Sequence, residues 1–197
     1  MLRIKAKVPV RSYSGEKWKT NKTNKKYLAQ DFNHRCAYCD DLDRYNGGMR
    51  SYHVEHFAPK EKFPALKYTY DNLLYACPYC NEAKSDKWPS DSPEISVVGD
   101  KGFIDPCTDD YYKYIYRNED GSIGYNGELG KYIYNELNLY LKRHQINYNL
   151  ISVNEKIEEL GDIIQREKEQ GKAVGQLEEL HYMLLKEFWY DVNELEQ

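Results

Sequence analysis

The chain has 197 residues, of which 41% are hydrophobic and 30% are charged. This composition is typical of a globular domain with one buried core, and it argues against a disordered or membrane-spanning chain. The sequence holds no run of about 18 apolar residues, and its first residues lack the apolar segment of a secretory signal. We therefore expect a cytoplasmic protein, free of the membrane, whose cysteines stay reduced.

Charge is distributed unevenly along the chain. The formal net charge is −4, but residues 1–27 carry nine basic residues against the single acid Glu16, and residues 151–197 carry five basic residues against twelve acids. A basic segment can neutralise nucleic-acid phosphates, whereas an acidic one repels them. The alternative is that the basic segment is only solvated.

Three regions follow one another along the chain. Residues 1–30 form a basic N-terminal arm, with little regular structure expected around "GEKWKTNKTNKK". Residues 31–105 hold four of the five cysteines and three of the five histidines, so we expect the chemistry there. Residues 106–197 are expected to form a β-hairpin followed by helices.

The stretch "SYHVEHFAPK" predicts a short strand that stops before Pro59. It places a carboxylate, Glu55, beside a titratable base, His56. Taken alone, the stretch could equally be a surface strand with polar residues facing water.

Two Cys-x-x-Cys motifs, "CAYC" at Cys36 and Cys39 and "CPYC" at Cys77 and Cys80, predict a structural zinc site. Each motif turns two sulfurs toward one ion, and four thiolates complete a tetrahedral shell. Such a closed site stabilises the fold and has no position left for a substrate. Zinc would also bring the segments around Glu55 and Asn81 close together.

In residues 106–197 the spacing of the apolar residues changes along the chain. "YYKYIYRNEDGSIGYN" alternates around an Asp-Gly turn and predicts a β-hairpin. From about Glu128 the apolar residues follow a helical period, "GKAVG" at 171–175 interrupts it, and a second helix is expected over about 176–195. The apolar residues of this predicted helical hairpin are either internal core or a docking face for another protein.

The central motifs together resemble the HNH endonucleases, whose core is a ββα-metal unit. The resemblance is carried by "CAYC", "VEHFAPK", "DNLLYA" and "CPYCNEAK" and covers roughly residues 34–90. It implies a zinc-stapled ββα-metal core. With the basic arm before this core and the helical hairpin after it, we expect an α+β fold.

The resemblance also implies roles for particular residues. His56 matches the general base and Asn72 the residue that orients the base and its loop. Glu55 and Asn81 match the ligands of a catalytic divalent ion, Mg²⁺ or Mn²⁺, although many relatives have Asp at the first position and His at the second. Lys60 and Lys84 are candidates for contacts with nucleic-acid phosphates.

The implied function is metal-dependent hydrolysis of DNA phosphodiester bonds. The motifs are similar to those of HNH subunits in Septu and related retron antiphage systems, which implies an ATPase partner, bound here through the C-terminal helices. Two alternatives stay open, namely a non-catalytic zinc module that binds nucleic acid or bridges proteins, and an HNH nuclease that acts on RNA.

Overall fold

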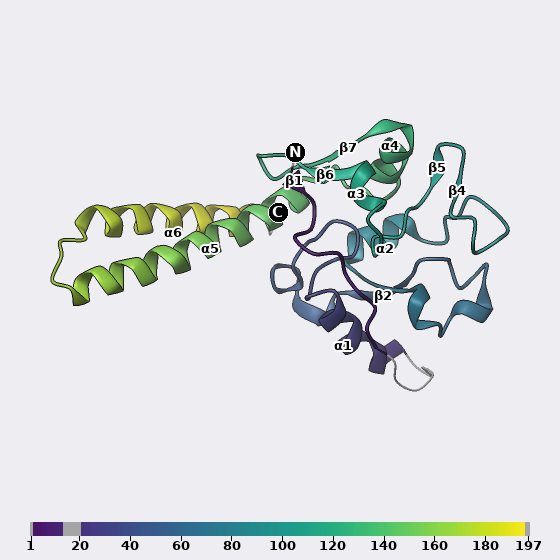
Figure 1. The fold of residues 1–197 in the computed structure, drawn as a ribbon, viewed down its shortest axis with the longest axis horizontal. Coiled ribbons are helices and arrows are strands. Elements are labelled where there is room, and N and C mark those ends of the chain that lie inside the picture. The colour runs from purple at the N-terminus through teal and green to yellow at the C-terminus, as the bar shows by residue number, and fades with distance from the viewer. Residues whose placement is uncertain (1, 14–20, 196–197) are drawn as a thin grey trace. The chain divides into compact units, whose positions relative to one another are not determined.

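The computed structural model describes residues 2–13 and 21–195. Residues 14–20, a part of the predicted basic arm, lie outside the described residues. The chain divides into two compact units, Met1–His144 and Gln145–Gln197, and Figure 1 shows the elements of both. Within the described residues, no helix combines the length and the apolar character needed to cross a membrane.

The first unit contains a ββα arrangement. Strand β2 (His53–His56) pairs antiparallel with β3 (Leu73–Ala76), and β3 leads into helix α2 (Pro78–Lys84). All four residues of β3 are buried, so this strand forms the centre of the core. Pro78 at the first turn of α2 is compatible with a helix start, because the backbone donor it lacks would have no partner inside the helix.

The other elements of the first unit surround this ββα arrangement. Strands β1 (Leu2–Arg3), β6 (Ile115–Arg117) and β7 (Ile123–Tyr125) form an antiparallel sheet in the order β1-β6-β7, and β4 (Val97–Val98) pairs with β5 (Lys101–Gly102). The helices are α1 (Asn21–Asp31), α3 (Tyr111–Tyr114) and α4 (Gly127–Glu136). Short 3₁₀ turns lie at Asp43–Tyr45, Gly48–Arg50, Pro64–Leu66 and Tyr70–Asn72. This mixture of strands and helices confirms the predicted α+β class.

Three local expectations need correction. Residues 21–26 belong to helix α1, which was not expected; the buried residues Leu28 and Ala29 near its C-terminal end anchor it to the core. The predicted hairpin is present as β6 and β7, but its first four residues, 111–114, are helical. The helical period from Glu128 is split into two helices, α4 and α5, because the chain turns after Glu136 and Asn138 adopts a positive φ of 53°.

The second unit consists of the long helix α5 (Lys142–Glu169), apart from its first three residues, and of α6 (Gly175–Leu195), which lie side by side as the predicted helical hairpin (Figure 1). The break between them coincides with the predicted one at 171–175. A small apolar core joins the two helices and is made of Leu160, Ile164 and Val174, with Leu177 and Leu184 packed against it. Other apolar side chains of α6 are exposed: Leu180, Tyr182, Met183, Trp189 and Tyr190.

Candidate functional site

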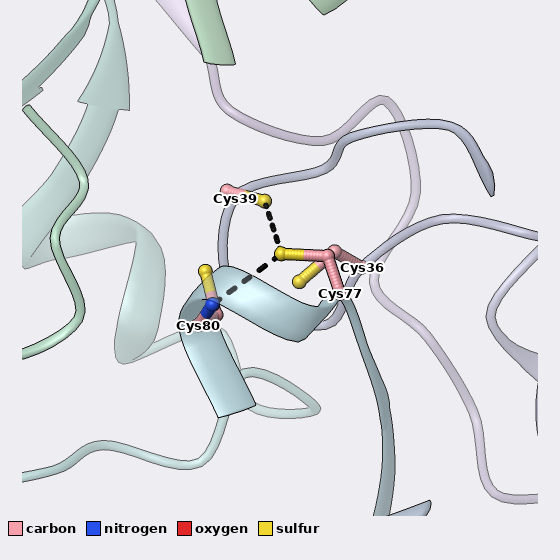
Figure 2. A group of neighbouring side chains, drawn as sticks. All are labelled: Cys36, Cys39, Cys77 and Cys80. Atoms are coloured by element: carbon pink, nitrogen blue, oxygen red, sulfur yellow. Dashed lines mark hydrogen bonds between the residues drawn. The ribbon is translucent and has the colours of Figure 1, made fainter. Parts of the chain in front are cut away.

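The four cysteines of the two Cys-x-x-Cys motifs meet in the core of the first unit (Figure 2). All four are fully buried free thiols, and their sulfur atoms lie within 4.8 Å of one another. Cys36 and Cys39 come from the loop after α1, Cys77 caps the N-terminus of α2, and Cys80 lies in its first turn. The zinc-stapled core predicted from the motif spacing is thus confirmed as an arrangement of residues.

The cluster fits one tetrahedral metal ion. The Sγ atoms of Cys39 and Cys77 are 3.7 Å apart, and a tetrahedral zinc ion with Zn–S bonds of about 2.3 Å separates its sulfurs by about 3.8 Å. Burial raises the pKa of Cys39, Cys77 and Cys80, because a buried thiolate lacks solvation. Burial also opposes ionisation of Cys36, but hydrogen bonds from the other three thiols lower its pKa overall. A divalent cation would supply the positive charge that this buried group needs.

Buried polar side chains hold the first Cys-x-x-Cys motif, Cys36 to Cys39, in place. Lys5 donates a hydrogen bond to the backbone carbonyl of Cys36, and Arg117 donates one of 2.7 Å to that of Cys39. Cys39 also forms a buried group with Asp41 and His144. In this group, Nδ1 of His144 lies 2.7 Å from Oδ2 of Asp41. Burial opposes protonation of His144, but Asp41 and Cys39 outweigh it and raise the pKa of His144 well above its ordinary value.

A polar cleft lies over the ββα arrangement. It has a volume of about 420 Å³ and is lined from β2 and the loop after it and from α2 and the turn after it. Four of the predicted site residues line this one cleft: Glu55, His56, Lys60 and Asn81. Residues 25 positions apart in the sequence therefore share one open space, which the surface-strand interpretation of Glu55 and His56 does not explain.

The ring of His56 is oriented by the backbone. Its Nε2 lies 2.9 Å from the carbonyl oxygen of Lys67. A carbonyl only accepts, so Nε2 carries the proton, and in the neutral ring Nδ1 is left as an acceptor. Burial is the main cause that lowers the pKa of His56 below its ordinary value of 6.5. The imidazole is thus neutral and basic at neutral pH.

Asn72 fastens the loop that follows β2. Its Oδ1 accepts a hydrogen bond of 2.8 Å from the backbone nitrogen of Ala58, and its Nδ2 donates one of 2.9 Å to the backbone oxygen of the same residue. The structure places no contact between Asn72 and the His56 ring among the hydrogen bonds of the described residues. Asn72 therefore acts on the loop two residues after His56 and reaches the base only through the backbone.

Glu55 is buried and paired with Lys84. Its Oε1 is 2.9 Å from the Nζ of Lys84. Burial raises the pKa of Glu55, and the nearby Lys84 ammonium partly offsets that effect. Glu55 still lines the cleft, so its carboxylate lies between a buried cation and the open space.

The two candidate phosphate-binding lysines differ sharply. Lys60 is half-buried at the cleft, where its Nζ lies 3.5 Å from Glu61. Lys84 has no exposed surface. The expectation that Lys84 contacts a phosphate is therefore wrong in this fold, because its ammonium is enclosed by Glu55 and by the backbone at His56.

Several residues at these sites are not among the predicted site residues. Glu61, Ser85 and Asp86 complete the polar lining of the cleft. Glu61 follows the Pro59–Lys60 pair directly, so its position beside the predicted site was a usable signal. His144 lies 105 residues after Cys39 in the sequence, and its position beside the cluster depends on the path of the whole first unit, which no local pattern reveals.

Comparison with known proteins agrees with this geometry. Residues 36–87 match the family model of the HNH endonucleases. The chain is 29% identical to the Septu protein PtuA of Bacillus mycoides (strain KBAB4) over 143 residues, which is 63% of this chain and 20% of that protein. It is 35% identical to the Septu protein PtuB of Bacillus thuringiensis over 74 residues, which is 37% of this chain and 28% of that protein.

The matched stretches thus span between a fifth and somewhat over a quarter of the length of these relatives. The family match, in contrast, contains every cysteine of the cluster and every residue that lines the cleft. Residues 36–87, with both sites inside them, form an HNH endonuclease domain.

Proposed function

We propose that this protein is a metal-dependent endonuclease that hydrolyses DNA phosphodiester bonds. The observation that carries the proposal is the shared cleft of Glu55, His56 and Asn81 inside the HNH match. A base and two oxygen donors beside one open space are what hydrolysis of a phosphodiester requires.

His56 is the proposed general base. Its Nε2 proton is held on the carbonyl of Lys67, so Nδ1 accepts the proton of an attacking water. That water attacks phosphorus in line with the leaving oxygen, and the family resemblance implies 5′-phosphate and 3′-hydroxyl products. The lowered pKa of His56 keeps the acceptor available at neutral pH.

Glu55 and Asn81 are the proposed ligands of the catalytic ion. Both offer oxygen atoms, which Mg²⁺ and Mn²⁺ prefer, and the cleft has room for waters and a phosphate group beside them. Bound there, the ion would offset the negative charge that develops on the phosphate oxygens in the transition state. Glu61 and Asp86 add negative charge to the same lining.

Other residues have supporting roles in this proposal. Lys60 is the remaining candidate for a phosphate contact in the cleft. Asn72 keeps the loop after β2 in place through Ala58. The four-cysteine cluster holds structural Zn²⁺, whose shell the protein fills completely, so this ion takes no part in the reaction.

The wider context is proposed from the relatives. Similarity to PtuA and PtuB supports a place in a cytoplasmic, multi-protein Septu-type antiphage system. An ATPase partner would bind the C-terminal helices, because α6 exposes Tyr182, Trp189 and Tyr190 beyond the residues that the internal core of the hairpin uses.

The proposal is tested by nicking of supercoiled plasmid in Mg²⁺ or Mn²⁺. Replacing the general base, His56→Ala, is expected to slow cleavage by about 10²–10⁴-fold. The matched control is His53→Ala, an exposed histidine of the same strand, which should cleave like the wild type. Equal background in the wild type and His56→Ala would favour the non-catalytic zinc module.

The RNA alternative is tested with the same proteins. DNA and RNA differ at the 2′-hydroxyl, and the predicted catalytic groups do not discriminate between the two backbones. Cleavage of RNA that needs His56, without cleavage of DNA, would replace the proposed substrate and keep the proposed chemistry.

A further inference from the structure

Lys84 is unusual among the lysines that the structure describes because its side chain is completely enclosed. Its ammonium lies 2.9 Å from Oε1 of Glu55, donates a hydrogen bond of 3.2 Å to the backbone carbonyl of His56, and sits 5.4 Å from the centre of the Phe103 ring. A buried lysine persists only where its charge is paired and its donors are used. Here the two polar partners are the Glu55 carboxylate, a proposed metal ligand, and the backbone of His56, the proposed general base.

The position of Lys84 in α2 gives these contacts a geometric meaning. Lys84 is the last residue of the helix, whereas Cys77 caps its start and Cys80 lies in its first turn. The cysteine cluster therefore fixes one end of α2, and Lys84 fixes the other end to strand β2. Asn81 lies between these two attachments, one turn before Lys84, so its distance from Glu55 depends on both.

We propose that Lys84 is a positioning residue of the divalent-ion site. Its buried ammonium holds the Glu55 carboxylate and the backbone at His56 in register with Asn81, so that the oxygen donors from β2 and α2 face one ion. This inference rests on the proposed function, since it concerns the ion that Glu55 and Asn81 would bind. It assigns Lys84 no contact with DNA and no proton transfer.

If Lys84 only stabilised the fold, its loss would lower stability without affecting the divalent-ion site. Lys5 offers a matched control for this alternative. Lys5 is also buried, pairs with Asp40 at 3.1 Å and donates to a backbone carbonyl, that of Cys36. This second pair lies at the cysteine cluster and not at the cleft. Lys84→Met and Lys5→Met each remove a buried ammonium from a carboxylate, so both should lower the melting temperature, but only Lys84→Met should disturb the divalent-ion site.

The test measures Mn²⁺ binding to the zinc-loaded full chain by electron paramagnetic resonance, with cleft binding defined as the component that Asn81→Ala removes. Lys84→Met should weaken that component by about 10–100-fold, the usual effect of losing a group that orients a metal ligand. Lys5→Met that retains its zinc should leave it unchanged, because the intact cysteine cluster still fixes the start of α2. Cleft binding of Mn²⁺ in Lys84→Met as tight as in the wild type would overturn the proposal.

Two further results are decisive. If Lys84→Met shows no cooperative unfolding transition, Lys84→Gln takes its place, because the amide keeps one donor; unchanged Mn²⁺ affinity in folded Lys84→Gln overturns the inference. If the wild type has no Mn²⁺ component that depends on Asn81, the proposed metal-dependent function fails, and the inference about Lys84 fails with it. The wild type alone thus reports on the function, and the comparison with Lys84→Met reports on Lys84.

Discussion

The two ends of helix α2 place polar groups in opposite environments. At its start, four cysteine thiols with no exposed surface lie close to one another. At its end and along its side, Glu55, His56 and Asn81 border a cleft of about 420 Å³. The same short helix therefore joins a closed cluster to an open one.

The two ends of α2 differ in how many protein ligands each provides for its proposed metal ion. Four protein ligands saturate a tetrahedral ion, and the binding energy goes into folding. Two oxygen donors leave most positions of a hard cation to water and substrate, so the binding energy there can serve a reaction. Damage to the closed end should therefore unfold the domain, whereas damage to the open end should leave a folded but impaired protein.

Removal of one cysteine tests the closed end and has the largest expected effect. Cys77→Ser removes a thiolate ligand of the cluster, whereas the serine hydroxyl can still cap the start of α2. Structural zinc contributes about 10–16 kcal/mol of apparent binding free energy in small domains, which is as large as the whole stability of a typical domain. We expect loss of zinc by elemental analysis, loss of the cooperative thermal transition, and poor solubility.

The control for this experiment is Cys107→Ser. Cys107 is half-buried and lies outside the four-cysteine cluster, so the variant should keep its zinc and its melting temperature nearly unchanged. A Cys77→Ser protein that melts like the wild type and retains its metal would remove the distinction between the closed and the open end.

A smaller effect is expected at the open end from Asn72→Ala. The change leaves the buried backbone N–H and C=O of Ala58 without their side-chain partner. Each buried unsatisfied group costs about 1–3 kcal/mol, so for two groups we expect about 2–6 kcal/mol of lost stability in urea denaturation, with the zinc content unchanged. Nicking activity should fall as well, because the loop after His56 loosens.

Asn126→Ala serves as the matched control. The Asn126 side chain donates one hydrogen bond at an exposed position, so its loss should cost less than about 1 kcal/mol. If Asn72→Ala instead lost its zinc as its stability fell, the closed and the open end of α2 would not respond independently to mutation.

Features held within short stretches of sequence could be predicted. The Cys-x-x-Cys spacing fixes the local geometry of each motif. The ββα arrangement formed by β2, β3 and α2 brings Glu55 and Asn81 to one cleft. The hairpin at 115–125 follows from an Asp-Gly turn between alternating residues, although the preceding tyrosines adopt a helical turn. In each case, the deciding pattern lies within one short motif or is repeated in two short motifs.

Features that depend on distant packing could not be predicted. Lys84 looks like a surface lysine in the sequence, and its burial arises because Phe103 and strand β2 close over it. Helix α1 begins in an Asn- and Lys-rich stretch with little apolar signal, and its fully buried apolar residues Leu28 and Ala29 lie near its end. Asn138 interrupts an otherwise continuous helical period through its backbone conformation, which residue type alone does not dictate.

The smallest expected effect concerns the one cysteine outside the cluster. The cluster thiols are protected by the metal, whereas Cys107 is protected by its surroundings: burial is the main cause that raises its pKa to about 12. The thiolate is the reactive form, so at pH 8.5 such a shift from 9.0 lowers the thiolate fraction roughly 1000-fold. The greater nucleophilicity of a more basic thiolate recovers about 30-fold of this.

Alkylation of Cys107 by iodoacetamide in the native, zinc-loaded chain should thus be roughly 30-fold slower than that of a free cysteine peptide. The rate should rise about tenfold per pH unit up to pH 12, because each unit multiplies the thiolate fraction by ten. Peptide mapping by mass spectrometry measures the labelling of each cysteine, with denatured, chelator-treated protein as the fully reactive reference. Rapid labelling of Cys107 at pH 8.5, with the other four still protected, would show that the metal alone shields thiols in this protein.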